Sequence, residues 1–194
     1  DILCLADGVS SRSEDDAAYN KALTERRSAA NAAADILGAK SITFHDLPDN
    51  KLDTVPLLNI VEPIEKAIAE SKADAVFTHH SGDLNVDHRL VHQAVVTACR
   101  PQLHQSVRSM FFFEVPSSTE WQVPGVKAAF EPNYFIDTTQ FLDRKIEALR
   151  AYGAELRDWP HPRSVEGVKH LNKWRGATIG ADSAEAFILG RMIQ

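Results

Sequence analysis

The sequence predicts an α/β fold in which a mostly parallel sheet is covered by helices on both faces. Continuous apolar runs at 2–6 and 75–78 are typical of strands that are buried on both sides. Stretches rich in helix-forming residues separate these runs. Strand and helix patterns therefore alternate through the first half of the chain, and such alternation indicates a parallel sheet. In a sheet of this kind, ligands bind beyond the carboxyl ends of the strands.

The first half contains three strand–helix pairs, and each helix is bounded by a sequence signal. Gly38 is expected to end the first helix, because glycine adopts the left-handed conformation of a helix C-terminus. Pro56 is expected to open the second helix, and Pro63 to kink or break it. Asp87 is a candidate N-cap for the third helix, which Pro101 ends. The expected elements are strands at 2–6, 42–44 and 75–78 and helices at about 16–37, 56–70 and 88–100.

The second half departs from this alternation. A strand is expected over 107–115, and its centre holds Phe111, Phe112 and Phe113. Three adjacent aromatic residues on a strand point to both faces, so both faces need apolar cover. A proline-rich loop follows this strand. The remaining expected elements are a strand at 134–137 and helices at 138–152, 164–175 and 183–193.

Composition limits the class of protein and of partner. The length of 194 residues suits a single domain over 1–194. The net charge is −6, so the chain as a whole does not attract nucleic acid or anionic membranes. It lacks the run of about 18 apolar residues that a membrane-spanning helix needs. The two cysteines, Cys4 and Cys99, are isolated, which favours a reducing, cytoplasmic location.

The start of the chain is unusual for a natural N-terminus. Residue 1 is Asp rather than Met, and a buried-strand pattern follows it with no lead-in. No signal-peptide pattern precedes the strand. We therefore expect the chain to be truncated at its N-terminus.

The segment from Thr78 to Arg89 carries most of the chemistry. It holds three histidines and two aspartates, at the expected end of a strand and the start of a helix: His79, His80, Asp83, Asp87 and His88. Imidazole and carboxylate groups are ligands for zinc and similar divalent metals. Asp87 and His88 are adjacent and cannot face the same way from a helix. Such a pair suits one metal ligand and one group that orients it or handles a proton.

A purely structural interpretation of this segment stays open. A polar loop with a helix cap explains Asp83, Asn85 and Asp87 without any function. His92 lies one helical turn after His88 and is either a second ligand or a core histidine. The sequence contains no complete metal motif, no phosphate-binding glycine loop and no Gly-x-Ser-x-Gly element. Spacing alone therefore does not decide between a metal site and a solvated loop.

Several short motifs, spread over nearly the whole chain, together resemble one family. They are Asp7-Gly8, Arg26 ahead of Leu37-Gly38, the loop 47–53, Asn85-Val86-Asp87-His88, Arg175-Gly176 and Ala184-Glu185-Ala186-Phe187. In this order they resemble the LmbE/PIG-L family of zinc-dependent N-deacetylases, in its bacterial LmbE-like branch. The resemblance implies a Rossmann-like α/β fold. It also implies hydrolysis of N-acetyl groups, mostly on molecules that contain N-acetylglucosamine.

The resemblance implies a role for each matching residue. His88 would be a zinc ligand, Asp87 would orient a neighbouring imidazole, and Arg26 would be the active-site arginine. The implied substrate-binding residues are Asp7, Asp49 and Asn85. From the residues alone, Arg26 is equally a solvated helix residue, Asp49 a turn former and Asp7 a loop cap.

Two departures from the family pattern matter. The family's His-Pro-Asp-Asp-Glu element supplies a zinc-binding His, a zinc-binding Asp and the general-base Asp. Residues 1–194 contain no copy of it, and we expect it upstream of the first strand. In addition, Asn85 stands where many members carry His, and an amide cannot carry a positive charge.

The resemblance implies a metal-dependent hydrolase that removes an N-acetyl (acyl) group from an amino sugar or related glycan precursor. We expect one Zn²⁺ per chain in the complete protein, and weak or absent zinc binding and near-zero activity in these 194 residues. Other hypotheses are a non-catalytic ligand-binding domain on the same scaffold and a nucleotide-binding protein of the Rossmann type. The expected partners are a small-molecule amino sugar and no nucleic acid, with a homo-oligomer possible.

Overall fold

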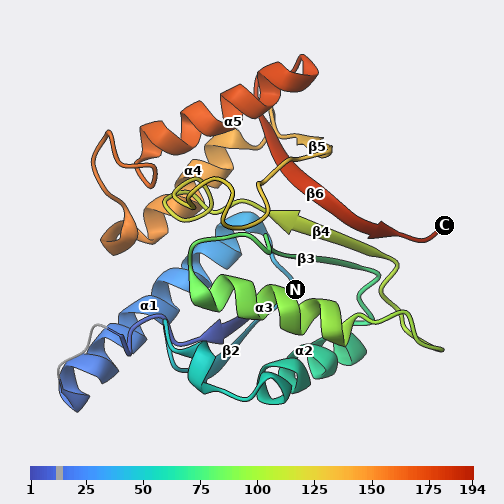
Figure 1. Cartoon of the computed structure of the whole chain (residues 1–194). Coiled ribbons are helices and arrows are strands. Elements are labelled where there is room, and N and C mark those ends of the chain that lie inside the picture. Colours follow the sequence, from blue (N-terminus) through green and yellow to red (C-terminus); the bar gives the residue numbers. More distant parts are fainter. Residues whose placement is uncertain (12–14) are drawn as a thin grey trace. The chain divides into compact units, whose positions relative to one another are not determined.

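The computed structural model describes residues 1–11 and 15–194, which form two compact units. Unit 1 consists of Asp1–Asn50 and Ile136–Glu185, and unit 2 of Lys51–Phe135 and Ala186–Gln194. Figure 1 labels the helices and strands. In chain order the elements are β1 (Ile2–Ala6), α1 (Asp16–Leu37), β2 (Ile42–Leu47), the 3₁₀ helix η1 (Leu52–Thr54), α2 (Leu57–Ser71), β3 (Ala75–His79), α3 (Val86–Ala98), β4 (Ser109–Phe113), β5 (Tyr134–Asp137), α4 (Leu142–Ala151), the 3₁₀ helix η2 (Gly153–Glu155), α5 (Val165–Ile179) and β6 (Ala184–Met192).

Unit 1 is built on the parallel pair β1 and β2. Ile2 lies opposite Ile42, and the register shifts between Cys4 and Ala6 near the end of β1. Helix α1 ends at Gly38, whose φ of 72° is the left-handed conformation that the sequence predicts. Helix α4 packs against both α1 and α5. The predicted first strand and first helix are therefore confirmed, while β2 extends beyond the predicted end at residue 44.

In unit 2, helices α2 and α3 pack side by side (Figure 1). Pro56 caps α2 as expected, but Pro63 lies inside one continuous helix, so a break at this position was a wrong prediction. Proline removes only one helical hydrogen bond there, to the carbonyl of Asn59. Helix α3 begins at Val86 with Asn85 as its N-cap, so the prediction of Asp87 as the cap was also wrong.

Four strands form the larger sheet, in the order β3-β4-β6-β5. β3 and β4 are parallel, whereas β4 and β6 are antiparallel. The α/β class is confirmed, but the sheet is mixed rather than mostly parallel. The helix predicted at 183–193 was wrong, because this segment is strand β6. Its helix-forming residues are overridden by pairing with β4, where Phe113 lies opposite Phe187.

The three phenylalanines of β4 are covered on both faces, as the sequence predicts. Phe111 is 5 % exposed and stacks on Phe77, with ring centroids 4.7 Å apart. Phe112 packs against the ring of His92, and Phe113 against the ring of His79. The phenylalanines of β4 thus pack both in the apolar core of unit 2 and against His79 at the end of β3. In the part of the chain that the structure describes, no helix is long and apolar enough to cross a membrane.

Candidate functional site

The connection from β3 to α3 places the histidine-rich segment. β3 ends at His79, and a short loop leads to Asn85, which caps α3. The Asn85 Oδ1 accepts hydrogen bonds from the backbone amides of Asp87 at 2.8 Å and His88 at 3.4 Å. This cap ties His88 into the first turn of α3, next to the carboxyl end of β3. Ligands bind at such strand ends in α/β proteins.

Asp83 is the most enclosed polar side chain of this loop, with no exposed surface. Its Oδ1 accepts hydrogen bonds from Nδ1 of His88 at 2.9 Å and from the backbone amide of Asn85 at 2.9 Å. The Ser118 hydroxyl also donates to Oδ1. The Thr119 hydroxyl donates to Oδ2 at 2.6 Å. Four donors therefore surround one buried carboxylate, which satisfies the rule that buried charges are hydrogen-bonded.

These donors keep the Asp83 carboxylate ionised. Burial by itself raises the pKa of Asp83, but the hydrogen bonds from His88, Ser118 and Thr119 outweigh it and hold the pKa below its ordinary value. An ionised carboxylate only accepts hydrogen bonds. Nδ1 of His88 must therefore carry a proton and donate it, which leaves Nε2 of a neutral ring as the nitrogen with a lone pair.

His79 lies directly against His88. Their rings stack with centroids 4.2 Å apart and planes inclined by 18°. Burial, together with the nearby His88, lowers the pKa of His79 to about 3. Nδ1 of His79 is buried and has no hydrogen-bond partner among the residues that the structure describes. His79 is thus a neutral imidazole at neutral pH.

The other two histidines of this region have structural contacts. The His92 ring pairs its Nδ1 with the carbonyl oxygen of His79 at 2.9 Å and packs on Phe112. Burial lowers the pKa of His92. His80 is 3 % exposed, and its Nε2 donates to the carbonyl oxygen of Ala128 at 2.9 Å. Of the two alternatives for His92, these contacts favour the core histidine.

One imidazole in unit 2 fits a zinc ligand. A histidine that binds metal nearly always donates its other ring N–H to a carboxylate or carbonyl, and His88 does so to Asp83. Among residues 1–11 and 15–194, no group of three His, Cys, Asp or Glu side chains is arranged to hold a metal ion. The described residues therefore offer His88 as a single oriented ligand.

Two further predicted residues stand beside His88 in unit 2. Asp87 is buried, and its Oδ1 accepts a hydrogen bond from the backbone amide of Leu52 at 3.0 Å. This bond fixes η1 to the head of α3. Asn85 uses its side-chain oxygen as the helix cap. Their predicted roles in orienting an imidazole and binding substrate remain predictions.

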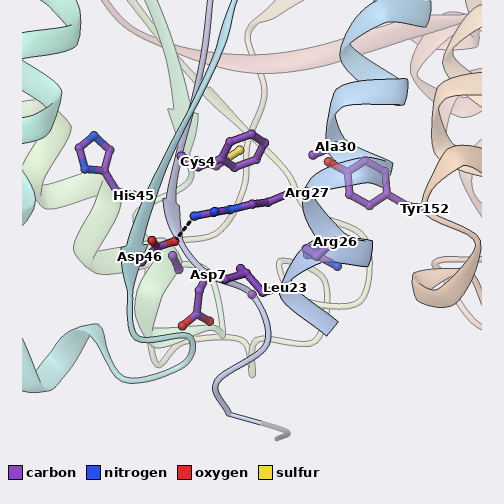
Figure 2. Close-up of a pocket in the computed structure, with 12 residues that line it drawn as sticks. Cys4, Asp7, Leu23, Arg26, Arg27, Ala30, His45, Asp46 and Tyr152 are labelled. Carbon is purple, nitrogen blue, oxygen red and sulfur yellow. Dashed lines mark hydrogen bonds and ion pairs between the residues drawn. The ribbon is translucent and has the colours of Figure 1, made fainter. Parts of the chain in front are cut away.

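Asp7 and Arg26 lie together in unit 1. Both line a cavity of about 100 Å³ between β1, β2 and α1, which also contains Cys4 and Tyr152 (Figure 2). Arg26 forms an ion pair with Glu155, Nη1 to Oε1 at 2.8 Å, and its guanidinium lies 5.4 Å from the centre of the Tyr152 ring. The Asp7 Oδ1 accepts hydrogen bonds from the backbone amides of Val9 and Ser10 at 2.9 Å.

A second arginine crosses the same cavity. Arg27 pairs with Asp46, Nη2 to Oδ1 at 2.5 Å, as the dashed line in Figure 2 marks. Its guanidinium also lies 5.5 Å from the centre of the Phe44 ring. Each arginine of this cavity therefore has one carboxylate and one aromatic neighbour, which positions both guanidinium groups.

The predicted substrate residue Asp49 lies in the loop after β2. Its Oδ2 accepts hydrogen bonds from Ser11 Oγ at 2.5 Å and from the side-chain amide of Asn50 at 2.9 Å. Its backbone amide donates to Ser10 Oγ at 2.9 Å. These bonds join the loop after β1 to the loop after β2. They favour the turn-forming alternative, and the substrate-binding role stays a prediction.

Four residues that shape these sites were not predicted in the role that the structure gives them. Asp83 was named in the histidine-rich segment, as metal-site chemistry or as loop polarity, but not as the partner of His88; its position five residues before His88 was a usable signal. Ser118 and Thr119 reach Asp83 from the distant loop between β4 and β5. Glu155 pairs with both Arg26 and Arg163. No local pattern connects the last three residues to their partners, because these contacts are made only in the folded chain.

Three solved structures share this fold at low sequence identity. N,N′-diacetylchitobiose deacetylase from Pyrococcus horikoshii is 18% identical, with a TM-score of 0.73 over 97% of this chain and 72% of its own. GalB, the 4-carboxy-2-hydroxymuconate hydratase of Pseudomonas putida KT2440, is 21% identical, with a TM-score of 0.74 over 99% of this chain and 85% of its own. The A40926 pseudoaglycone deacetylase Dbv21 is 18% identical, with a TM-score of 0.68 over 99% and 85%.

A family match agrees with the motifs of the first half. Residues 1–99, about half of the chain, match the PIG-L family, described as GlcNAc-PI de-N-acetylase. The matched segment includes Asp7, Arg26, Asp49 and the whole stretch from His79 to His88. The chain therefore belongs to the PIG-L family, as its motifs predict.

Proposed function

We propose that this protein is a metal-dependent hydrolase that removes an N-acetyl (acyl) group from an amino sugar or related glycan precursor. Membership of the PIG-L family supports this reaction class. Two of the three structures above are named as deacetylases, while the third is named as a hydratase. Since one fold serves different reactions, the function has to be argued from the residues of the site. The observation that carries it is the 2.9 Å contact between Nδ1 of His88 and Oδ1 of Asp83.

His88 is the proposed zinc ligand of this chain. Its Nδ1 is occupied by Asp83, so Nε2 is the atom that would hold the cation. When bound, zinc lowers the pKa of its water to roughly 7 and polarises a carbonyl. A site of imidazole and carboxylate selects only weakly between zinc and iron. We propose one metal per chain in the natural protein and only weak binding by the 194 residues alone, where His88 is a single oriented ligand.

Asp87 and Arg26 are the proposed catalytic residues of this chain. Asp87 accepts a hydrogen bond from the backbone amide of Leu52, which fixes its carboxylate for the proposed role of orienting a neighbouring imidazole or handling a proton. The Arg26 side chain is 34% exposed, and its pairing with Glu155 engages one edge of the guanidinium. The remaining N–H groups suit a substrate oxygen. Asp7, Asp49 and Asn85 are the proposed substrate-binding residues, through hydrogen bonds to sugar hydroxyls.

The test is acetate release from N-acetylglucosamine and its disaccharide, measured with the natural protein purified in the presence of zinc. Wild-type protein is expected to form one amine for each acetate released. His88→Asn is expected to abolish this activity, because Asn does not replace an imidazole as a ligand. The matched control is His104→Asn, which changes an exposed histidine of unit 2. Equal acetate release by both variants would contradict the proposal.

A non-catalytic ligand-binding domain is the second candidate. The observation that favours it is that the described residues show no group of three side chains arranged to hold a metal. This candidate predicts that the natural protein binds amino sugars, detected by calorimetry, yet releases no acetate when zinc is supplied. Acetate release that depends on His88 would exclude it.

A further inference from the structure

We propose that Asp83 is a positioning residue that fixes the His88 imidazole in the tautomer with Nδ1 protonated, which leaves the lone pair of Nε2 for a divalent cation. This inference deepens the proposed function and rests on it for the identity of the cation. It extends the site to a residue outside the segment Asn85–His88 that carries the family resemblance.

The hydrogen bonds of Asp83 determine which nitrogen of the His88 ring carries the proton. Oδ1 of Asp83 already accepts from the Asn85 amide and from the Ser118 hydroxyl. An ionised carboxylate has no hydrogen to give, so the bond to Nδ1 of His88 requires a proton on the imidazole. In a neutral ring, the proton on Nδ1 leaves Nε2 with its lone pair. The Asp83 carboxylate thus selects one of two tautomers that are otherwise similar in free energy.

The second oxygen of Asp83 is held independently. Thr119 Oγ1 accepts a hydrogen bond from the Val115 amide at 2.7 Å, so its own proton points away from that bond. That proton is donated to Oδ2 of Asp83 at 2.6 Å. The loop after β4 therefore fixes the rotation of the carboxylate. With both oxygens engaged, Asp83 cannot turn away from His88 without losing buried hydrogen bonds.

Asp83 is not a solvated surface residue, because it is fully buried beside a partly exposed His88. Its side chain has no exposed area, while the side chain of His88 is 22% exposed. The pair therefore joins a buried anchor to an imidazole that reaches the surface. The Asn85 amide and the Ser118 and Thr119 hydroxyls already supply donors to both oxygens of this buried carboxylate. A purely structural role of Asp83 does not explain its additional hydrogen bond to His88.

The test is a two-bond ¹H–¹⁵N correlation spectrum of the imidazole rings, recorded on the 194-residue chain without metal. In the wild type, the neutral form of the His88 ring is expected to be protonated at Nδ1 and unprotonated at Nε2. In Asp83→Ala, the ring is expected to move to the Nε2-protonated form that predominates in water. Asp74→Ala is the matched control, since Asp74 is an exposed residue of unit 2. A shift of the tautomer in Asp83→Ala but not in the control supports the inference.

The wild-type spectrum alone can overturn the inference, so the test does not depend on the folding of a variant. A His88 ring protonated at Nε2, or exchanging between both tautomers, would do so. Zinc titration of the natural protein with and without the same change gives a second readout, with Asp83→Ala expected to bind about 10-fold or more weakly than the wild type. Equal zinc affinity in both variants would also contradict it. The tautomer is measured without metal or substrate, so failure of the deacetylase proposal remains a separate result.

Discussion

The imidazole rings of His79 and His88 stack in parallel, with their centroids 4.2 Å apart. His79 comes from the last residue of β3, and His88 from the first turn of α3. The edge of the His88 ring, at Nδ1, contacts the Asp83 carboxylate, and its face stacks on the neutral ring of His79. His79 therefore limits the tilt of His88, while Asp83 fixes its rotation.

Acidification is expected to destabilise the folded chain through His79. Its pKa is about 3 in the folded state, below the ordinary value of 6.5, because the ring is buried. The unfolded chain therefore takes up this proton first, and stability falls as the pH drops below 6.5. Between pH 7 and pH 5 the loss from His79 is on the order of 2 kcal/mol. Urea denaturation at a series of pH values measures it.

His79→Phe is the informative variant for this pH dependence. Phenylalanine keeps an aromatic ring on His88 but cannot titrate. We expect the unfolding free energy of this variant to fall less steeply between pH 7 and pH 5, with the remainder coming from groups such as His92, whose pKa is also lowered. His104→Asn serves as the control and keeps the wild-type slope. The account is wrong if His79→Phe keeps that slope too.

Gly82 is expected to tolerate no side chain. A Cβ at this position would lie 2.0 Å from the carbonyl oxygen of Ala128 and 2.7 Å from Nε2 of His80. Gly82→Ala therefore separates His80 from Ala128 and costs about 1–3 kcal/mol of stability. Gly153→Ala is the control, because no atom of the described residues, apart from its chain neighbours, lies within 4 Å of its added Cβ. Similar unfolding free energies for the two variants in urea would refute this prediction.

We expect position 190 to accept only glycine, because an aromatic ring packs against it. A Cβ there would lie 2.5 Å from the ring of Phe112. Gly190→Ala should lower stability by about 1–3 kcal/mol. Phe112→Leu removes the far end of the ring, so the double variant should show a smaller additional cost from Gly190→Ala. A double-mutant cycle measures this coupling, and strict additivity of the two changes would argue against the contact.

The cap of α3 is expected to hold the backbone around His88. Asn85→Ala removes the acceptor for the amides of Asp87 and His88 and should cost about 1 kcal/mol. Asn85→Ser keeps a capping oxygen and should recover most of the loss. Hydrogen exchange at these two amides gives the local readout. Unchanged exchange in Asn85→Ala would place the cap elsewhere.

The sequence predicted the elements whose signals are local. Gly38 ends α1 and the apolar runs form β1 and β3. Both signals depend only on residues that are neighbours in the sequence. The segment 184–192 was predicted as a helix, since its Ala-Glu-Ala-Phe start favours one. Its state is decided by pairing with β4, which lies far away in the sequence.

The candidate site was predictable only in part. His88 and its neighbours lie in one short segment, so their chemistry was visible in the sequence. The anchoring of Asp83 was not, because Ser118 and Thr119 lie 35 and 36 residues away. Asp87 was the predicted cap of α3. Only the backbone geometry shows that Asn85 receives the two amides.

The most direct test of the account is the zinc content of the natural protein, measured by elemental analysis after extensive dialysis. We expect one zinc per chain in the wild type and in His104→Asn, and essentially none in His88→Asn. Zinc retained at full stoichiometry by folded His88→Asn would show that the metal is held without this imidazole and would contradict the account.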